Sequence, residues 1–271
     1  MLNLFWADEG GLPANDRGLA YGDGLFETVR MQGQQGVLLS RHLMRLVRDA
    51  ARLGIEVSRE ELRGVCVQAA QRWADSFENG WVLKLTLTRG AGGRGYRPDD
   101  KMRPNLLVSA GPLPPAPDAE GVVADFSSVS LSVNPMFAGI KSLNRLEQVM
   151  AARQLHDGLF EVIMSNRDGY LIEGTRTNLL LKTREGWVTP PVSALAVAGV
   201  MREWLLERLR ERGESVLERP LTIADATGPD CQGLFLLNSV FGLVPVRCFA
   251  DQDLPVDSGL ATIVHPLDLL E

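Results

Sequence analysis

The sequence PLPPAPDA, at residues 112–119, decides how this chain is divided, because it places four prolines in eight residues. Such a segment is stiff and extended, and it continues neither a helix nor a central strand. The chain has 271 residues and a hydrophobic fraction of 45%, which is enough for two modest cores. We therefore expect an N-terminal domain at 1–111, a proline-rich linker at 112–119 and a C-terminal domain at 120–271.

Before the linker, strand and helix patterns follow one another. An alternating run with a Gly/Gln turn at 25–40 predicts a β-hairpin, and apolar residues at helical spacing predict a helix over 41–55 that Gly54 ends. Ser58, followed by Glu61, forms the capping-box pattern that opens a second helix. Further strands are expected at 4–8, 81–90 and 105–111. These elements indicate an α+β unit.

After the linker, strand patterns predominate. Residues 160–174 predict two strands joined by an Asp-Gly turn. A helix is predicted from Val200 to Arg212, and Gly213 ends it. Other strands are expected at 121–132, 177–190, 233–239 and 242–249.

Composition excludes several classes of protein. The net charge of −6 argues against a general nucleic-acid binder. No apolar run is long enough to cross a bilayer, and the first residues turn polar too soon for a signal peptide, so we expect no membrane association. Three scattered cysteines without a CxxC pair indicate the reducing cytoplasm, and three separated histidines predict no metal site.

The stretch GAGGRG at residues 90–95 matches the GxGxxG pattern of dinucleotide-binding sites. That site also needs a helix opening from the glycines, and Pro98 and Pro104 prevent one here. We therefore expect a flexible loop whose arginines contact substrate, rather than a dinucleotide site.

Lysine is scarce, since only four of the 28 basic residues are lysines. Lys101 and Lys182 occupy ordinary solvated positions, and Lys84 is expected on the wetter face of a strand. Lys141 stands just before a predicted helix, for which Ser142 or Asn144 can provide the cap and along which Leu146, Val149, Met150 and Arg153 follow at helical spacing. A helix start and the apolar MFAGI segment before it would lower the pKa of this amine and make it a nucleophile. The alternative is a plain solvated lysine.

A lysine that forms a Schiff base usually serves pyridoxal 5′-phosphate (PLP), which needs an anion at its pyridine nitrogen and a cradle for its phosphate. Glu173 ends an apolar strand, Gly199 opens the long helix, and Arg45 could add a guanidinium. Each also has a plain structural interpretation, respectively as a strand-end acid, a helix entry without ligand and a solvated helix face.

Taken in order, these motifs resemble the fold-type IV PLP enzymes, the family that holds branched-chain aminotransferases, D-amino acid aminotransferases and 4-amino-4-deoxychorismate lyase. DRGLAYGDGLFETVR at 16–30 is similar to the family's N-terminal signature. The resemblance implies a two-domain α+β fold of the D-amino acid aminotransferase type, with a small N-terminal α/β domain and a larger C-terminal α/β domain that binds PLP. It implies that Lys141 forms the Schiff base and that Glu173 is the acid opposite the pyridine nitrogen. The phosphate would be bound by Arg45, Gly199, Val200, Met201 and Ser239.

Within the family, three details resemble the lyases: NRLEQV at 144–149, shortly after Lys141, the loop TRGAGGRGYRP, and a short chain. They imply conversion of 4-amino-4-deoxychorismate into 4-aminobenzoate and pyruvate for folate synthesis, with Lys141 removing a proton after Schiff-base exchange. The small-molecule substrate carries two carboxylates, and its candidate partners are Arg89, Arg94, Arg97 and Arg145. The resemblance also implies a homodimer and functional coupling to an aminodeoxychorismate synthase.

Three alternatives remain beside the lyase. The first is a fold-type IV aminotransferase for D-amino or branched-chain amino acids, which shares the cofactor residues. A non-catalytic binding protein needs neither Lys141 nor Glu173, so their presence weighs against it. A Schiff-base aldolase without PLP leaves the phosphate elements at Arg45 and Gly199 unexplained.

Overall fold

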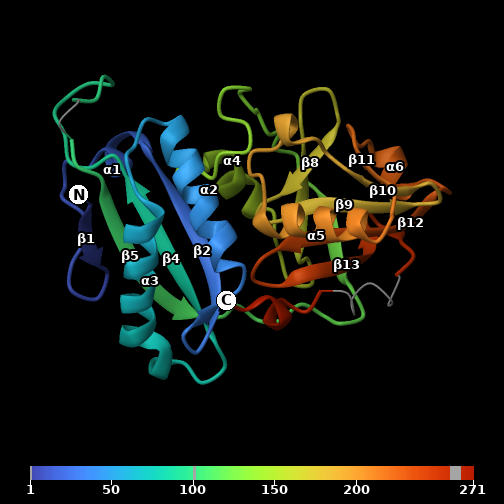
Figure 1. Cartoon of the computed structure of the whole chain (residues 1–271). Coiled ribbons are helices and arrows are strands. Elements are labelled where there is room, and N and C mark those ends of the chain that lie inside the picture. Colours follow the sequence, from blue (N-terminus) through green and yellow to red (C-terminus); the bar gives the residue numbers. More distant parts are fainter. Residues whose placement is uncertain (1, 100–101, 257–263) are drawn as a thin grey trace. The chain divides into compact units, whose positions relative to one another are not determined.

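The computed structural model describes residues 2–99, 102–256 and 264–271, so Lys101 lies outside the described residues. It contains two compact units, which Figure 1 shows with the chain coloured from blue to red. Unit 1 comprises Met1–Pro114, Lys141–Asn144 and Leu269–Glu271, and unit 2 comprises Pro115–Ile140 and Arg145–Asp268. The main division falls inside the predicted linker. Two short segments beyond it group with unit 1, because they pair with its backbone, whereas the sequence pattern placed them in the C-terminal domain.

Unit 1 is built on a five-stranded sheet with the order β1-β5-β4-β2-β3. Its strands are β1 (Asn3–Trp6), β2 (Gly24–Gln32), β3 (Gln35–Gly36), β4 (Trp81–Thr88) and β5 (Asn105–Pro112). Its helices are α1 (Arg17–Tyr21), α2 (Leu39–Arg52), α3 (Arg59–Trp73) and the short 3₁₀ helix η1 (Ala74–Ser76). Helices α2 and α3 cover one face of the sheet (Figure 1), which carries the buried leucines of β4 and β5.

Several expectations for unit 1 are confirmed. The hairpin forms from β2 and β3, and Gly54 follows α2 with a φ of 65°. The Ser58 and Glu61 capping box is present at the start of α3. Lys84 is exposed, on the opposite face of β4 from its buried leucines.

Unit 2 is built on a nine-stranded sheet with the path β11-β10-β9-β12-β13-β6-β7-β8, while β14 pairs with β13. An additional β8–β9 pairing closes the strands from β9 to β8 into a ring. The strands are β6 (Val122–Phe126), β7 (Glu161–Ser165), β8 (Leu171–Gly174), β9 (Asn178–Thr183), β10 (Gly186–Thr189), β11 (Val216–Glu218), β12 (Cys231–Asn238), β13 (Gly242–Phe249) and β14 (Gln252–Asp253). The helices are α4 (Leu146–Ala152), α5 (Val200–Glu211) and α6 (Ile223–Thr227), with 3₁₀ turns η2 (Val192–Ala194) and η3 (Pro266–Leu269).

The expected strand at 121–132 is shorter than predicted, since β6 ends at Phe126. The core of unit 2 contains apolar residues of β6, β9, β12 and β13, among them Leu179, Leu236 and Phe249. Within the described residues, we find no helix with the length and apolarity that spanning a membrane requires.

Candidate active site

Lys141 belongs to a four-residue segment that pairs with the edge of β2. The N–H of Phe26 donates to the carbonyl oxygen of Lys141 at 3.1 Å, Ser142 forms an antiparallel bridge with Leu25, and the N–H of Leu143 donates to Gly24 at 3.0 Å. This register puts Lys141 opposite Phe26, and its Nζ lies 4.2 Å from the centre of the Phe26 ring. The lysine is thus fixed in unit 1 through its backbone.

The predicted helix cap at Ser142 or Asn144 is wrong. Helix α4 begins at Leu146, its N-cap is Arg145, and no side chain caps it. The Asn144 side chain instead donates to the carbonyl oxygen of Gly22 at 3.0 Å. The position of Lys141 therefore results from pairing with a distant strand rather than from the end of a helix.

Asp49 of α2 provides a further anchor for the lysine segment. Its Oδ2 accepts the N–H of Lys141 at 3.2 Å, and the residue is 1% exposed. Burial raises the pKa of Asp49, although the charge of Arg48 opposes this shift. The sequence analysis did not single out this acid.

Arg45 lies in a buried cluster between α2 and β2. Its Nε and Nη2 donate to the two oxygens of Glu27 at 2.8 and 2.6 Å, and Nδ1 of His42 contacts Glu27 Oε2 at 2.6 Å. Burial by itself raises the pKa of Glu27, but the charges and hydrogen bonds of Arg45 and His42 lower it to about 2. Glu27 is therefore an anion that holds the Arg45 guanidinium in one orientation.

His42, Arg45 and Asp49 share one face of α2, because they stand at positions i, i+3 and i+7. Burial lowers the pKa of His42, and its buried Nε2 has no hydrogen-bond partner among the described residues. A buried polar atom of this kind is normally satisfied by water or a ligand. The sequence could have indicated Glu27, because it lies two residues from both Leu25 and Val29 and therefore on the same buried face of β2.

Glu173, the other central prediction, lies in β8 of unit 2 and is 3% exposed. Its Oε2 accepts the N–H of Val197 at 3.1 Å. Asn178, its partner across β8 and β9, donates from Nδ2 to the carbonyl oxygen of Val197 at 2.9 Å. The peptide groups of Val197 are thus held by two neighbouring strands, and the carboxylate is fixed where water has little access.

The same Asn178 reaches the start of α5. Gly199 is the N-cap of this helix and has no side-chain cap, while Val200 and Met201 are buried. A Cβ at Gly199 would clash with Oδ1 of Asn178, so any larger residue requires Asn178 or the helix start to shift. A buried helix start without a side-chain cap offers its backbone N–H groups to an anion. Glu173, Gly199, Val200 and Met201 are therefore brought together around one strand pair.

Ser239 lies at the same end of the sheet of unit 2. It is 7% exposed, in the turn after β12, and the preceding Leu237 pairs with Asn178. Within this turn, Oδ1 of Asn238 accepts the N–H groups of Val240 and Phe241. The turn is thus ordered independently of the Ser239 hydroxyl.

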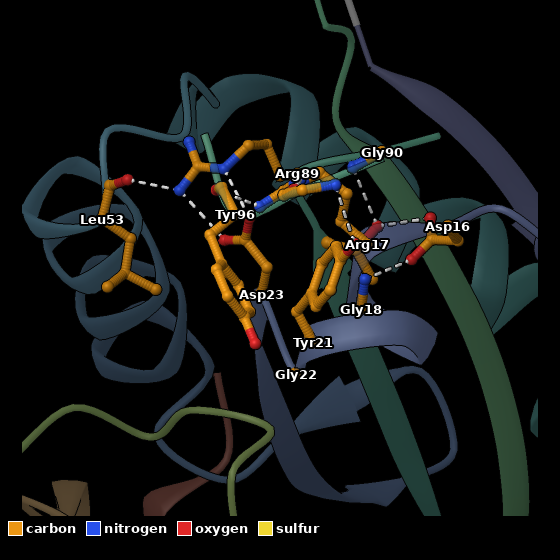
Figure 2. A network of polar contacts seen from close by, with 12 residues as sticks. Asp16, Arg17, Gly18, Tyr21, Gly22, Asp23, Leu53, Arg89, Gly90 and Tyr96 are labelled. Atoms are coloured by element: carbon orange, nitrogen blue, oxygen red, sulfur yellow. Dashed lines mark hydrogen bonds and ion pairs between the residues drawn. The ribbon is translucent and has the colours of Figure 1, made fainter. Parts of the chain in front are cut away.

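The four candidate substrate arginines have different surroundings. Arg89 donates from Nε and Nη2 to Asp23 and from Nη2 to the carbonyl oxygen of Leu53 (Figure 2). Its Nη1 also donates to the carbonyl oxygen of Gly54, just after α2. Arg145 donates to the carbonyl oxygens of Ile140 at 2.7 Å and Ala196 at 3.5 Å. Arg94 and Arg97 are exposed on the loop between β4 and β5. All four remain predictions as substrate residues. Among the described residues, Arg94 and Arg97 form fewer hydrogen bonds and ion pairs than Arg89 and Arg145.

Comparison with known proteins adds a family to this geometry. The sequence model described as Amino-transferase class IV matches residues 24–249. A proposed branched-chain-amino-acid aminotransferase from Methanocaldococcus jannaschii is 31% identical over 85% of this chain and 80% of its own length. An aminodeoxychorismate lyase from Vibrio harveyi is 28% identical over 97% of this chain and 98% of its own.

Two solved structures are similar in fold and sequence. The 4-amino-4-deoxychorismate lyase from Pseudomonas aeruginosa is 37% identical with a TM-score of 0.86, covering 92% of this chain and 91% of that one. A hypothetical aminotransferase from Mycobacterium tuberculosis in a PLP-bound form is 26% identical with a TM-score of 0.78, covering 96% and 92% of the two chains. These neighbours confirm the predicted two-domain α+β fold of type IV.

Proposed function

The chain belongs to the amino-transferase class IV family, and on this premise we propose that it is a PLP-dependent lyase. Its reaction converts 4-amino-4-deoxychorismate into 4-aminobenzoate and pyruvate for folate synthesis. The observation that carries the proposal is the anchoring of Lys141, whose backbone is bound to β2 and Asp49 while its Nζ lies over Phe26. The two similar proteins named for this reaction support the choice of substrate.

The residues present fit PLP. In unit 1, Lys141 would carry the covalent bond, and the charge of Arg45, oriented by Glu27, suits the phosphate. In unit 2, the uncapped start of α5 suits a phosphate, and the buried carboxylate of Glu173 suits a protonated pyridine nitrogen. The turn at Ser239 adds a buried hydroxyl.

When bound, PLP supplies an electron sink for the bonding pair that remains after proton loss. Lys141, as a neutral amine, removes the proton from the amino-bearing carbon of the substrate ring. Glu173 would hold the proton on the pyridine nitrogen, because its carboxylate is buried and is oriented by the N–H of Val197. The enolpyruvyl C–O bond then breaks, the ring becomes aromatic, and 4-aminobenzoate and pyruvate account for all atoms of the substrate.

The experiment that tests this proposal uses PLP-loaded protein and 4-amino-4-deoxychorismate without any oxo acid. We expect equal and sustained release of 4-aminobenzoate, followed by fluorescence, and of pyruvate, followed by a coupled assay. Release of neither product would overturn the lyase proposal.

The second candidate is an aminotransferase for D-amino or branched-chain amino acids, which the similarity to the Methanocaldococcus protein favours. It predicts that D-alanine or leucine is consumed together with 2-oxoglutarate, and that 4-aminobenzoate is not formed. We also propose that the chain works as a homodimer, which light scattering of the PLP-loaded protein tests directly.

A further inference from the structure

The loop that joins β4 to β5 would have little order of its own. Residues 90–95 contain four glycines, and Gly90 and Gly95 adopt φ values of 107° and 95°. Glycine in such conformations leaves the backbone free to move unless other groups hold it. The loop also carries Arg94 and Arg97, both exposed and without hydrogen bonds or ion pairs to other described residues.

One buried side chain holds this loop. Arg17, of which 5% of the side chain is exposed, donates from Nη1 to the carbonyl oxygen of Gly95 at 2.9 Å and from Nη2 to that of Tyr96 at 2.7 Å. Its Nε donates to Asp23 at 2.8 Å. All three nitrogens of the guanidinium therefore donate hydrogen bonds, and two of these bonds go to the carbonyl oxygens of adjacent loop residues.

Tyr21 completes the attachment. The Arg17 guanidinium lies 4.7 Å from the centre of the Tyr21 ring, and that ring lies 5.5 Å from the ring of Tyr96. The Tyr21 hydroxyl accepts the N–H of Gly95 at 3.2 Å. Both polar groups of the Gly95 residue are thus bound by α1 side chains.

Asp23 connects this attachment to the rest of unit 1. Its carboxylate lies between the guanidiniums of Arg17 and Arg89, as Figure 2 shows, and Arg89 in turn reaches the end of α2 at Leu53. Burial raises the pKa of Asp23, but hydrogen bonds from Arg89 and Arg17 outweigh it and lower the pKa. Through Arg89, the ionised carboxylate therefore links Arg17 to the C-terminal end of α2.

The position of the bound carbonyls is informative. Gly95 and Tyr96 are the two residues between Arg94 and Arg97, so the attachment fixes the backbone at the point that carries both exposed guanidiniums. A loop that only linked two strands would not need a buried arginine at this point. Two arginines on a fixed backbone can receive a carboxylate without first being ordered.

We propose that Arg17 is a positioning residue, which holds the backbone between Arg94 and Arg97 so that their guanidiniums bind the carboxylates of an anionic substrate. The inference rests on the proposed function, because it names how that substrate is recognised. Arg17 forms no direct hydrogen bond with Lys141 among the described residues, so we expect its replacement to act on substrate binding more than on kcat.

The test compares Arg17→Gln, Tyr21→Phe and the control Arg72→Gln in PLP-loaded protein. Arg72 forms its ion pairs with Asp8 and Glu9 at an exposed position of α3. We expect Arg17→Gln to raise KM for 4-amino-4-deoxychorismate about 10- to 100-fold and to leave kcat within about threefold. Tyr21→Phe removes one hydrogen bond and should raise KM about two- to fivefold. Arg72→Gln should match the wild type.

A readout without turnover accompanies the kinetics. Trypsin cleaves after Arg94, whereas Pro98 blocks cleavage after Arg97, and mass spectrometry measures the rate of cleavage at Arg94. We expect trypsin to cleave the loop faster in Arg17→Gln than in the wild type. Chorismate, a dicarboxylate, should protect the loop from cleavage, and Arg17→Gln should need a higher concentration of it for half-protection. If Arg17→Gln does not fold, the smaller shifts of Tyr21→Phe in KM and in chorismate protection decide the question.

Two results would overturn the proposal. One is an unchanged KM and unchanged chorismate protection despite faster cleavage. The other is a loss of kcat and of bound-cofactor absorbance as large as the change in KM. A wild type without lyase activity would instead contradict the proposed function. In that case, KM for D-alanine or leucine and the protection by chorismate would still test whether Arg17 positions the loop.

Discussion

Lys141 and Glu173 are fixed in opposite ways. Lys141 is anchored through its peptide groups, which pair with β2 and donate to Asp49, and its Nζ lies over an aromatic ring. Glu173 is anchored through its carboxylate, which accepts a backbone N–H in a buried position.

This difference matches what each group would have to do. A lysine that forms and releases a covalent bond must keep its Nζ mobile, so its position has to come from the backbone. A carboxylate that keeps one charge throughout a reaction gains from a fixed hydrogen bond to that charge. The two regions should therefore respond differently when their central residues are changed.

The largest effect is expected for Lys141→Ala. Removal of the amine should lower kcat at least about 10⁴-fold, because both covalent attachment and proton removal are lost. Borohydride reduction followed by intact-mass measurement should show no cofactor adduct. Lys84→Ala is the matched control, since Lys84 Nζ lies 5.6 Å from the same Phe26 ring and should leave the adduct intact. An adduct that persisted in Lys141→Ala would sink the assignment.

Glu173→Gln should have the next largest effect. The amide cannot hold a proton on the pyridine nitrogen, so kcat should fall about 10²- to 10³-fold while the borohydride adduct remains. The control is Glu161→Gln in the neighbouring strand β7, where a buried carboxylate accepts hydrogen bonds from Thr175 and Thr177. It should reduce stability and leave kcat near the wild-type value. Equal losses of kcat in both variants would show that any buried acid of this unit has the same effect.

Local sequence patterns predicted much of this arrangement. The capping box of Ser58 and the helix end at Gly54 depend on neighbouring residues, so the sequence was sufficient. The pairing of Ser142 with Leu25 joins residues far apart in the chain, and no local pattern indicates it. The same limit applies to Arg17, since its two loop carbonyls lie more than 70 residues away.

Helix α4 shows a second limit of sequence patterns. Leu146, Val149 and Met150 stand at helical spacing, and such spacing normally marks a buried face. In the structure they are 74%, 56% and 42% exposed. Periodicity therefore predicted the helix correctly but gave no information about whether its apolar face is covered.

The comparison can be sharpened through the anion that orients Arg45. Glu27→Gln leaves the buried Arg45 without its partner and should lower the free energy of unfolding by about 3 kcal/mol at pH 7. The folded state lowers the pKa of Glu27 from 4.5 to about 2, so it binds fewer protons than the unfolded state and this stability is present above pH 4.5. The difference between wild type and variant should therefore shrink as the pH falls from 4.5 towards 2. Urea unfolding at several pH values measures it.

The exposed Glu56→Gln variant is the control for this series. It should show no comparable change with pH, because its carboxylate has no buried partner among the described residues. A constant difference between wild type and Glu27→Gln down to pH 2 would contradict the ion pair as the source of the stability.

The smallest effect is expected at the start of α5. In Gly199→Ala, the new methyl group would meet Oδ1 of Asn178, so Asn178 must give up its hydrogen bond to Val197 or the helix start must shift. Either change displaces the N–H groups proposed to hold the phosphate, and PLP should bind about tenfold more weakly, as measured by titration of the PLP-free protein. Gly64→Ala in α3 has open space around its Cβ and should stabilise the protein by about 0.5–1 kcal/mol without altering PLP affinity. Gly199 contacts Asn178, the cross-strand partner of Glu173. If PLP affinity were unchanged in Gly199→Ala, the start of α5 would not be the phosphate site. Glu173 would then be the one residue of this strand pair still proposed to contact the cofactor.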